Sequence, residues 1–116
     1  MIHLAVAPRA GRDLAALLSE SEDHFGPLVA ERYRRLVAAA LRDLRQDHQR
    51  LGVLWRADLA PSVRLYHLRH SRQRLKPADR IARPRHVLVF RVGKEGLIVV
   101  RVLHDAMDFP RHLRGA

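Results

Sequence analysis

The fold of this chain is decided by residues 86–104, which read HVLVFRVGKEGLIVVRVLH. Two runs dense in β-branched and aliphatic residues, 86–92 and 97–104, flank the tetrapeptide Gly-Lys-Glu-Gly at 93–96. β-Branched side chains favour strands, and a short connection bounded by glycine favours a hairpin. We therefore predict two antiparallel strands joined by a tight turn.

Upstream of this hairpin the sequence predicts one more strand and two loops. Residues 63–68 predict a strand. Residues 69–85 hold two prolines and a dense basic run, which predict an exposed, mobile loop. Residues 53–62 mix Trp55 with Pro61 and polar residues, and they predict a loop with Trp55 buried beneath it as a core side chain.

The N-terminal half predicts a short strand followed by two helices. Residues 2–6 alternate in the manner of a strand, and residues 9–23 place apolar side chains at three- and four-residue steps, which indicates one apolar helix face. Gly26 and Pro27 then interrupt the pattern. Residues 27–50 predict a second helix, with Gly52 just past its end. Its apolar stripe comprises Val29, Tyr33, Leu36, Val37, Ala40, Leu41, Leu44 and His48.

Taken together, these elements predict an α+β fold. A short N-terminal strand and a helical hairpin precede a three-stranded antiparallel meander, and the tail from Asp105 to Ala116 has short helical potential. A length of 116 residues fits one domain, so we expect a single domain over 1–116 with a basic insertion at about 69–85. Tyr33 and Phe90 are expected in its core.

Charge is the first indication of function. Residues 59–116 hold thirteen basic and four acidic residues, whereas residues 1–58 hold nine and eight, so nearly all of the net charge of +10 lies in the second half. Such asymmetry indicates an acidic partner, either nucleic acid, an acidic protein or a membrane surface. A positively charged surface without a specific ligand is the alternative.

Several classes of chemistry are excluded by composition and motif. The chain has no cysteine, so disulfides, thiolate metal sites and a cysteine nucleophile are excluded. It has no glycine-rich phosphate loop, no HExxH motif and no serine-nucleophile turn. We expect no metal and no cofactor. The sequence has no membrane-spanning run and no signal peptide, and we expect a cytoplasmic protein without membrane contact.

The remaining candidate functional side chains are basic residues and histidines. Between Arg64 and Arg91 there are nine basic residues and one acid, and Arg101 and His104 come from the adjoining strand. We expect Arg91, Arg101 and His104 to meet on one sheet surface. Such groups suit metal-free RNA cleavage, because histidine can move protons and guanidinium can stabilise a phosphorane. They suit equally an acidic protein segment, or a solvated face. A hydrogen bond to the C-terminal tail is the alternative role of His104.

The C-terminal half resembles the ending of toxins of the RelE/ParE superfamily, and the ParE branch most. The resemblance rests on the strand around Phe90-Arg91, the turn, the strand ending in RVLH at 101–104 and the D-F-P sequence at 108–110. The N-terminal half, with its short strand and helical hairpin, is similar to the family as well. The family's fold agrees with the elements predicted above.

This resemblance implies a toxin of a type II toxin–antitoxin module. Such toxins are neutralised by a protein antitoxin, which we expect to be acidic and to form a hetero-oligomer with this chain. ParE-like members inhibit DNA gyrase, whereas RelE-like members cleave mRNA on the ribosome. Ribonuclease members carry a tyrosine near the C-terminus, but here Asp105 follows His104 and no tyrosine follows Tyr66. The resemblance therefore favours a gyrase-binding toxin that is not an enzyme.

Two alternatives stay open. The first is a ribosome-dependent endoribonuclease in which Arg91, Arg101 and His104 are catalytic. The second is an inactive relative or a basic nucleic-acid-binding domain. Under the toxin hypotheses, the insertion at 69–85 departs from the family pattern and is a candidate specificity loop. The residues that we expect to contact the target or the antitoxin are Arg83, Arg85, Arg91, Arg101, His104 and Arg111.

Overall fold

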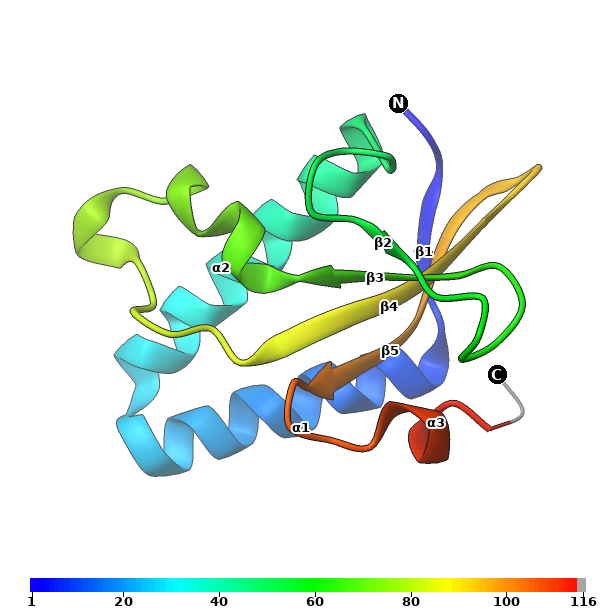
Figure 1. Ribbon diagram of the computed structural model, residues 1–116. Coiled ribbons are helices and arrows are strands. Elements are labelled where there is room, and N and C mark those ends of the chain that lie inside the picture. The colour runs from blue at the N-terminus through cyan, green and yellow to red at the C-terminus, as the bar shows by residue number, and fades with distance from the viewer. Residues whose placement is uncertain (115–116) are drawn as a thin grey trace.

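The computed structural model describes residues 1–114, in which a two-helix hairpin covers one face of a five-stranded sheet (Figure 1). Its elements are β1 (Leu4–Val6), α1 (Pro8–Phe25), α2 (Pro27–Gln46), β2 (Leu54–Trp55), β3 (Val63–His67), the 3-10 helices η1 (Leu68–Arg74) and η2 (Pro77–Asp79), β4 (His86–Gly93), β5 (Gly96–His104) and α3 (Phe109–His112). The predicted α+β class, with its helical hairpin and its meander of β3, β4 and β5, is confirmed. The last two residues of the predicted tail, 115–116, lie outside the described part of the chain.

The sheet is mixed, with the strand order β1-β5-β4-β3-β2. β1 pairs in parallel with β5, and all other pairs are antiparallel. The sequence predicted the first strand but not its partner. It also missed β2, which forms inside the predicted loop 53–62, because a two-residue strand is too short to show an alternating pattern.

Proline and glycine set the limits of the helices. Pro8 and Pro27 each occupy a first turn, where a missing N–H costs nothing. Gly26 separates the helices with a positive φ of 89°, which glycine adopts without steric cost. α2 ends at Gln46 instead of near residue 50, because Asp47 is extended and accepts a hydrogen bond from the Gln49 N–H. No helix among residues 1–114 is both long and apolar enough to cross a membrane.

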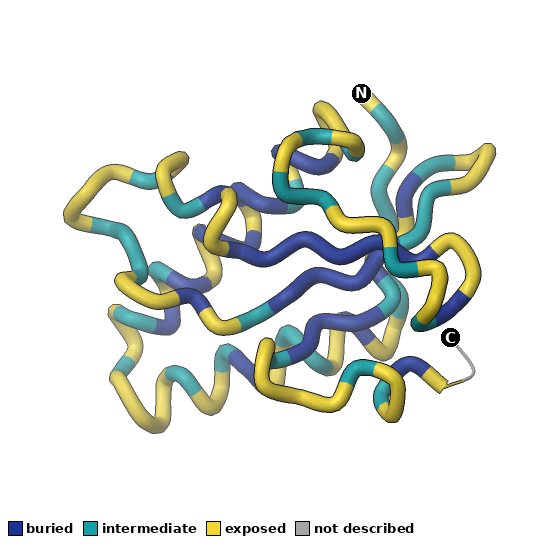
Figure 2. The backbone as a smooth tube through the Cα atoms, viewed as in Figure 1, coloured by how far each residue is buried: buried dark blue, intermediate teal, exposed yellow. Residues whose placement is uncertain are grey.

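Each face of the sheet has its own apolar core. The core between helices and sheet contains Tyr33 and Phe90, as predicted, together with Leu36, Leu44 and Leu88. The core on the other face is formed by side chains of β3, β4 and β5 beneath the C-terminal tail, and its members are Ala60, Val63, Leu65, Val87, Val89, Leu103 and Leu113. β3, β4 and β5 are therefore the buried centre of the molecule (Figure 2).

The prediction that Trp55 is a core residue is wrong. Trp55 is 59% exposed, because it lies on the outermost strand of the sheet. Its ring covers the side chain of its cross-strand neighbour Arg64, whose guanidinium carbon lies 3.7 Å from the ring centroid. The indole therefore packs on a cation at the sheet edge and not beneath a loop.

The basic segment 69–85 is mostly exposed, as predicted, but it contains η2 and most of η1 and is not an irregular loop throughout. η1 packs against α2, where buried Asp43 accepts hydrogen bonds or salt bridges from Ser71 at 2.6 Å and from Arg74 at 2.9 Å. Arg72 and Arg80 donate to backbone carbonyls of the same segment, at 2.7 and 3.0 Å. Much of the positive charge of this segment is therefore used to fold it.

Candidate functional site

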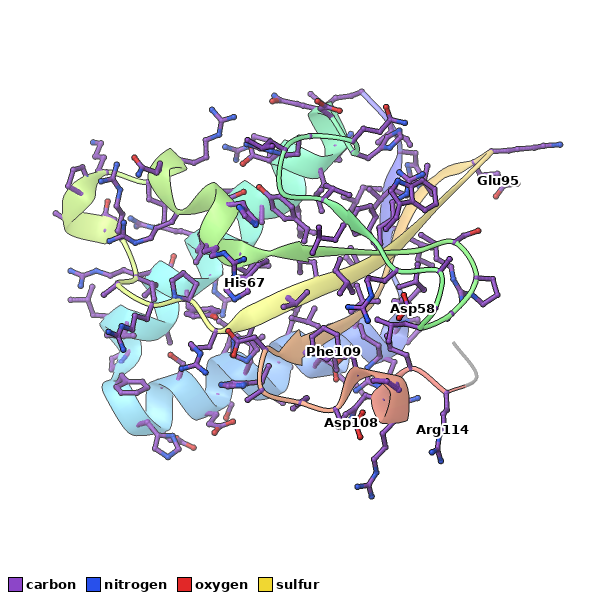
Figure 3. The ribbon with its side chains drawn as sticks, viewed as in Figure 1. Asp58, His67, Glu95, Asp108, Phe109 and Arg114 are labelled. Carbon is purple, nitrogen blue, oxygen red and sulfur yellow. The ribbon has the colours of Figure 1, made fainter. Side chains whose placement is uncertain are left out.

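Three histidines meet at one end of the sheet. His67 ends β3, His86 begins β4 and His104 ends β5. Antiparallel pairing sets His86 directly opposite His104, and their rings meet edge to face with centroids 5.3 Å apart. His67 lies at the end of β3, next to the first residues of β4 (Figure 3). We call these three residues, with Tyr33, Arg85 and Asp105, the histidine cluster.

Tyr33 and His86 form the buried half of the histidine cluster. The Arg85 N–H donates to Tyr33 Oη at 3.2 Å, so the Tyr33 hydroxyl is free to donate to His86 Nδ1, 2.6 Å away. Burial raises the pKa of Tyr33 to about 12. Burial, reinforced by the nearby His104, lowers the pKa of His86 to about 4. Both side chains are therefore neutral at pH 7, which this hydrogen bond requires.

Asp105 is the anion of the histidine cluster. It accepts from His67 Nε2 and from Arg85 Nε, each at 3.0 Å, and its N–H donates to the Arg85 carbonyl at 2.7 Å. Burial raises the pKa of the Asp105 carboxyl, but the hydrogen bonds from His67 and Arg85 outweigh it, and the net shift is downward. Asp105 is thus held ionised, and it ties the tail to β3 and to the segment before β4.

His104 is the exposed histidine of the cluster, with 36% of its side chain accessible. Its Nδ1 accepts from the Ala106 N–H at 3.1 Å, which is the predicted hydrogen bond to the tail. None of the hydrogen bonds within residues 1–114 uses its Nε2. The ring is therefore oriented by the tail, with one nitrogen left for an outside partner.

Arg101 is committed to contacts inside the molecule and is only 9% exposed. Its Nε lies 2.7 Å from Asp13 in α1, and a terminal nitrogen donates to the His112 carbonyl at 2.9 Å. Asp13 also accepts from the N–H of Val102, at the edge of β5 that the short β1 leaves uncovered. Arg101 thus joins helix α1, strand β5 and the C-terminal tail.

The expectation that Arg91, Arg101 and His104 meet on one sheet surface is wrong. His104 faces the helices, opposite His86. Arg101 pairs with Val89 of the core on the other face. Arg91 follows helix-facing Phe90 and therefore also points away from the helices, and it donates to the Pro61 carbonyl at 3.1 Å.

The remaining predicted site residues are spread over the surface. Arg83 is exposed in the segment before β4. Arg111 is exposed in α3, and its N–H donates to the side chain of Asp108, which caps that helix. Figure 3 shows Asp108 at α3. Of the six predicted residues, the structure brings together only Arg85 and His104, on either side of Asp105.

His67, His86 and Asp105 were not predicted from the sequence to form one cluster, and Tyr33 was predicted only as a core residue. A signal was present, because each histidine is the first or last residue of a strand in the meander. In consecutive antiparallel strands, the end of one lies beside the start of the next. Within residues 1–114, no group of three or more histidine, aspartate or glutamate side chains is arranged to hold a metal ion.

Comparison with known proteins places this geometry in context. Residues 4–109 match a protein family described as the ParE toxin of the type II toxin–antitoxin system parDE. Among solved structures, the chain is similar to the chromosomal ParDE toxin–antitoxin system from P. aeruginosa, with a TM-score of 0.65 and 21% sequence identity over 90% of this chain and 96% of that chain. At that identity the likeness concerns the fold. No curated protein sequence matches the chain.

Proposed function

Because this chain belongs to the ParE toxin family of type II toxin–antitoxin systems, we propose that it inhibits DNA gyrase by binding it and that a cognate antitoxin neutralises it. The family match identifies the chain as a ParE-type toxin. The target and the antitoxin contacts are our proposal. A gyrase-directed toxin acts where the chromosome lies, so the proposal places the chain in the cytoplasm as a hetero-oligomer with its antitoxin.

One observation supports binding over catalysis. The three residues that a ribonuclease of this kind would use, Arg91, Arg101 and His104, lie on opposite faces of the sheet. A phosphodiester cannot contact a general acid or base on one face and stabilising cations on the other. Arg101 is in addition paired with Asp13. This arrangement suits a protein that acts by binding a partner and not by cleaving RNA.

The surface arginines provide the proposed contacts. Arg83, Arg85 and Arg111 are exposed, and Arg91 and His104 are partly exposed, so each can reach an anionic group of a partner. Arg101 is proposed to act indirectly, by holding the tail that carries Arg111. With a net charge of +10, the chain will associate faster with an acidic antitoxin than with a neutral protein.

Ribosome-dependent mRNA cleavage is the second candidate function. The observation that favours it is His104, a partly exposed imidazole oriented by the tail, beside His86 and Asp105. In this alternative His104 exchanges a proton with the RNA, and arginines before β4, such as Arg83 and Arg85, contact the phosphate.

A short induction of the gene without its antitoxin separates the two functions. We expect an early fall in incorporation of labelled thymidine while incorporation of labelled methionine continues, since loss of gyrase activity stops replication first. An early fall in methionine incorporation would instead support mRNA cleavage. Absence of any effect on either label would contradict both and favour an inactive relative.

A further inference from the structure

The indole of Trp55 lies on the surface with one ring face open. Trp55 is in β2, the outermost strand of the sheet, and it is 59% exposed. It belongs to neither of the apolar cores within residues 1–114. The guanidinium carbon of Arg64 lies 3.7 Å from the ring centroid, so Arg64 covers one face of the indole. Because the residue is largely exposed, the opposite face is available to a partner. Figure 2 shows β2 as an exposed stretch beside buried β3.

The cation beneath the ring fixes the orientation of the indole. Arg64 is only 6% exposed, and its Nη1 lies 3.0 Å from Nδ1 of His48, just after α2. None of the salt bridges within residues 1–114 gives Arg64 a carboxylate, and its Nε is buried without a hydrogen-bond partner. A guanidinium over an aromatic face is stabilised by the negative charge of that face. The contact therefore holds the open face of Trp55 in place before any ligand arrives.

Trp55 lies on the side of the sheet that carries the helices. The register sets Trp55 opposite Arg64 and Arg64 opposite Phe90, whose side chain belongs to the core beneath the helices. The turn before β2 packs against η1, since a Cβ added at Gly52 would lie 2.7 Å from a ring carbon of His70. The basic helix η1 therefore lies beside the turn that leads to the indole.

Basic residues outnumber acidic ones around this turn. Asp43 contacts both Arg50 and Arg74, so one carboxylate is shared by two guanidinium groups. Arg69 is exposed in η1, and within residues 1–114 no salt bridge or hydrogen bond uses its guanidinium. Asp47 is an exposed acid at the end of α2. These three arginines and two aspartates carry a net charge of +1, which the guanidinium beneath the indole raises to +2. Such a surface attracts a polyanion.

We propose that the open face of Trp55 stacks on an unpaired base of a single-stranded nucleic acid, whose phosphates contact Arg69 and the neighbouring arginines. An aromatic ring for a base, with cations for the backbone, is the arrangement by which proteins bind single strands without reading their sequence. The bases of a duplex are stacked on one another, so their faces are closed to the ring. The inference goes beyond the proposed function, because it requires neither gyrase nor an antitoxin.

An acidic peptide fits the open ring face less well. The face of an aromatic ring is its negative part, so it repels a carboxylate, whereas a flat and uncharged base stacks on it. The charge of Arg64 lies on the covered side of the ring and is 6% exposed, so a carboxylate gains little from it. A nucleotide brings a flat base to the indole and a phosphate to the arginines together.

The test uses the emission of Trp55, the only tryptophan of the chain. The purified full-length chain is titrated with oligodeoxythymidylate or oligouridylate of about twelve nucleotides. We expect stacking to quench the emission. An abasic oligomer of the same length, which has the phosphates but no bases, should leave the emission unchanged, as should a blunt duplex. The tighter of the two single strands identifies the ligand as DNA or RNA.

Variants give the second measurement, in which the anisotropy of a labelled oligodeoxythymidylate reports binding. Trp55→Leu keeps an apolar cover over Arg64 but removes the aromatic face, and we expect it to weaken binding about five- to a hundredfold. Trp55→Phe keeps a ring and should retain most of the affinity. Phe25→Ala removes an exposed ring at the turn between α1 and α2, and this matched control should bind like the parent chain. Urea unfolding establishes that each variant is folded.

The outcomes decide between stacking and other contacts. If the abasic oligomer binds as tightly as oligodeoxythymidylate, or if Trp55→Leu binds like the parent chain, the contact is with phosphates alone and the proposal is overturned. Quenching by polyglutamate but not by either single strand would assign the ring to an acidic peptide and overturn it as well, as would absence of binding by both strands. The induction experiment tests the toxin function separately, so either proposal can fail without the other.

Discussion

At the scale of single residues, the chain uses its charged side chains mainly to hold its own segments together. Asp43 and Asp105 each accept from two separate segments, and Asp13 in α1 accepts from two adjacent residues of β5, Arg101 and Val102. Their partners include arginines that a view of the sequence alone assigns to a binding surface. In a chain with 22 basic and 12 acidic residues, these acids lie where segments meet, and Asp43 pairs with two arginines, Arg50 and Arg74. The arginines that remain exposed are therefore the better candidates for partner contacts.

Loss of the Asp13 charge should destabilise the protein strongly. Asp13→Asn keeps the size of the side chain but leaves Arg101, which is 9% exposed, without its carboxylate. Breaking such a largely buried pair typically costs about 3 kcal/mol. Urea unfolding monitored by circular dichroism measures the loss. Asp23→Asn, which removes the same charge from an exposed position of α1, should change the stability by less than about 0.5 kcal/mol. Equal losses of stability in the two variants would contradict this structural role of the Asp13–Arg101 pair.

At the scale of secondary-structure elements, a short β1 determines how α1 meets the sheet. β1 covers β5 only over Leu97–Val99, and Asp13 takes over at Val102. β5 also contains a bulge, since Val89 pairs with Arg101 while the next residue, Phe90, pairs with Val99. The extra residue Val100 resets the alternation of side chains between faces. Strand β1 and helix α1 therefore both contact the same edge of β5. The bulge between these contacts sets which side chains of β5 face the helices.

The junction of β1 and β5 should be sensitive to a single methyl group. Gly96 has a φ of 138°, and a Cβ there would overlap the carbonyl oxygen of His3, which accepts from the Leu97 N–H at 2.8 Å. Gly96→Ala is therefore expected to cost more than about 2 kcal/mol and to expose β1 amides in hydrogen exchange. Gly11→Ala in α1, where nothing lies within 4 Å of the added carbon, should instead stabilise the protein by about 0.5–1 kcal/mol. Equal changes in stability for Gly96→Ala and Gly11→Ala would contradict the overlap between a Cβ at position 96 and the His3 carbonyl oxygen.

At the scale of the whole molecule, the histidine cluster joins elements from both halves of the sequence. Tyr33 comes from α2, His67 from β3, His86 from β4, and His104 and Asp105 from the end of β5. His86 faces His104, and Asp105 contacts both His67 and Arg85, so neutral and charged side chains touch one another within the cluster. The global stability therefore depends on the charge state of this cluster.

Stability should fall in mildly acidic solution. The pKa of His86 is about 4 in the folded chain and 6.5 when unperturbed, so the unfolded state binds the proton first. The stability contributed by neutral His86 is complete above pH 6.5 and is lost as the pH falls to 4, by roughly 3 kcal/mol. Below the ordinary Asp pKa of 3.8, protonation of Asp105, whose pKa is lowered, adds a further loss. Urea unfolding across this range measures both.

A variant isolates the contribution of His86. In His86→Gln, the amide oxygen can still accept from Tyr33 but does not titrate, so the slope between pH 6.5 and 4 should flatten. His24→Gln, at the exposed end of α1, should keep the slope of the parent chain. A His86→Gln curve parallel to that of the parent would show that other groups cause the acid sensitivity.

The sequence by itself determined the family and the main helices and strands. Period-two and period-3.6 patterns, with glycine and proline at their ends, are local properties, so the hairpin at 86–104 and the two helices were predicted within a few residues. The excess of basic residues in the second half and the RVLH sequence at 101–104 could likewise be recognised from the sequence alone. The extent of a two-residue strand and the folding of the basic segment were not, because both depend on partners elsewhere in the chain.

Only the tertiary structure decided what the charged and aromatic residues do. Asp13 and Arg101 are 88 residues apart, and Tyr33 and His86 are 53 apart, so no local pattern signals their contact. The bulge at Val100 and the pairing register placed Arg91 and Arg101 on one face and His104 on the other. Edge position exposed Trp55, although a lone tryptophan in a loop suggests a core residue. These outcomes depend on which strands become neighbours, and that is settled by packing over the whole chain.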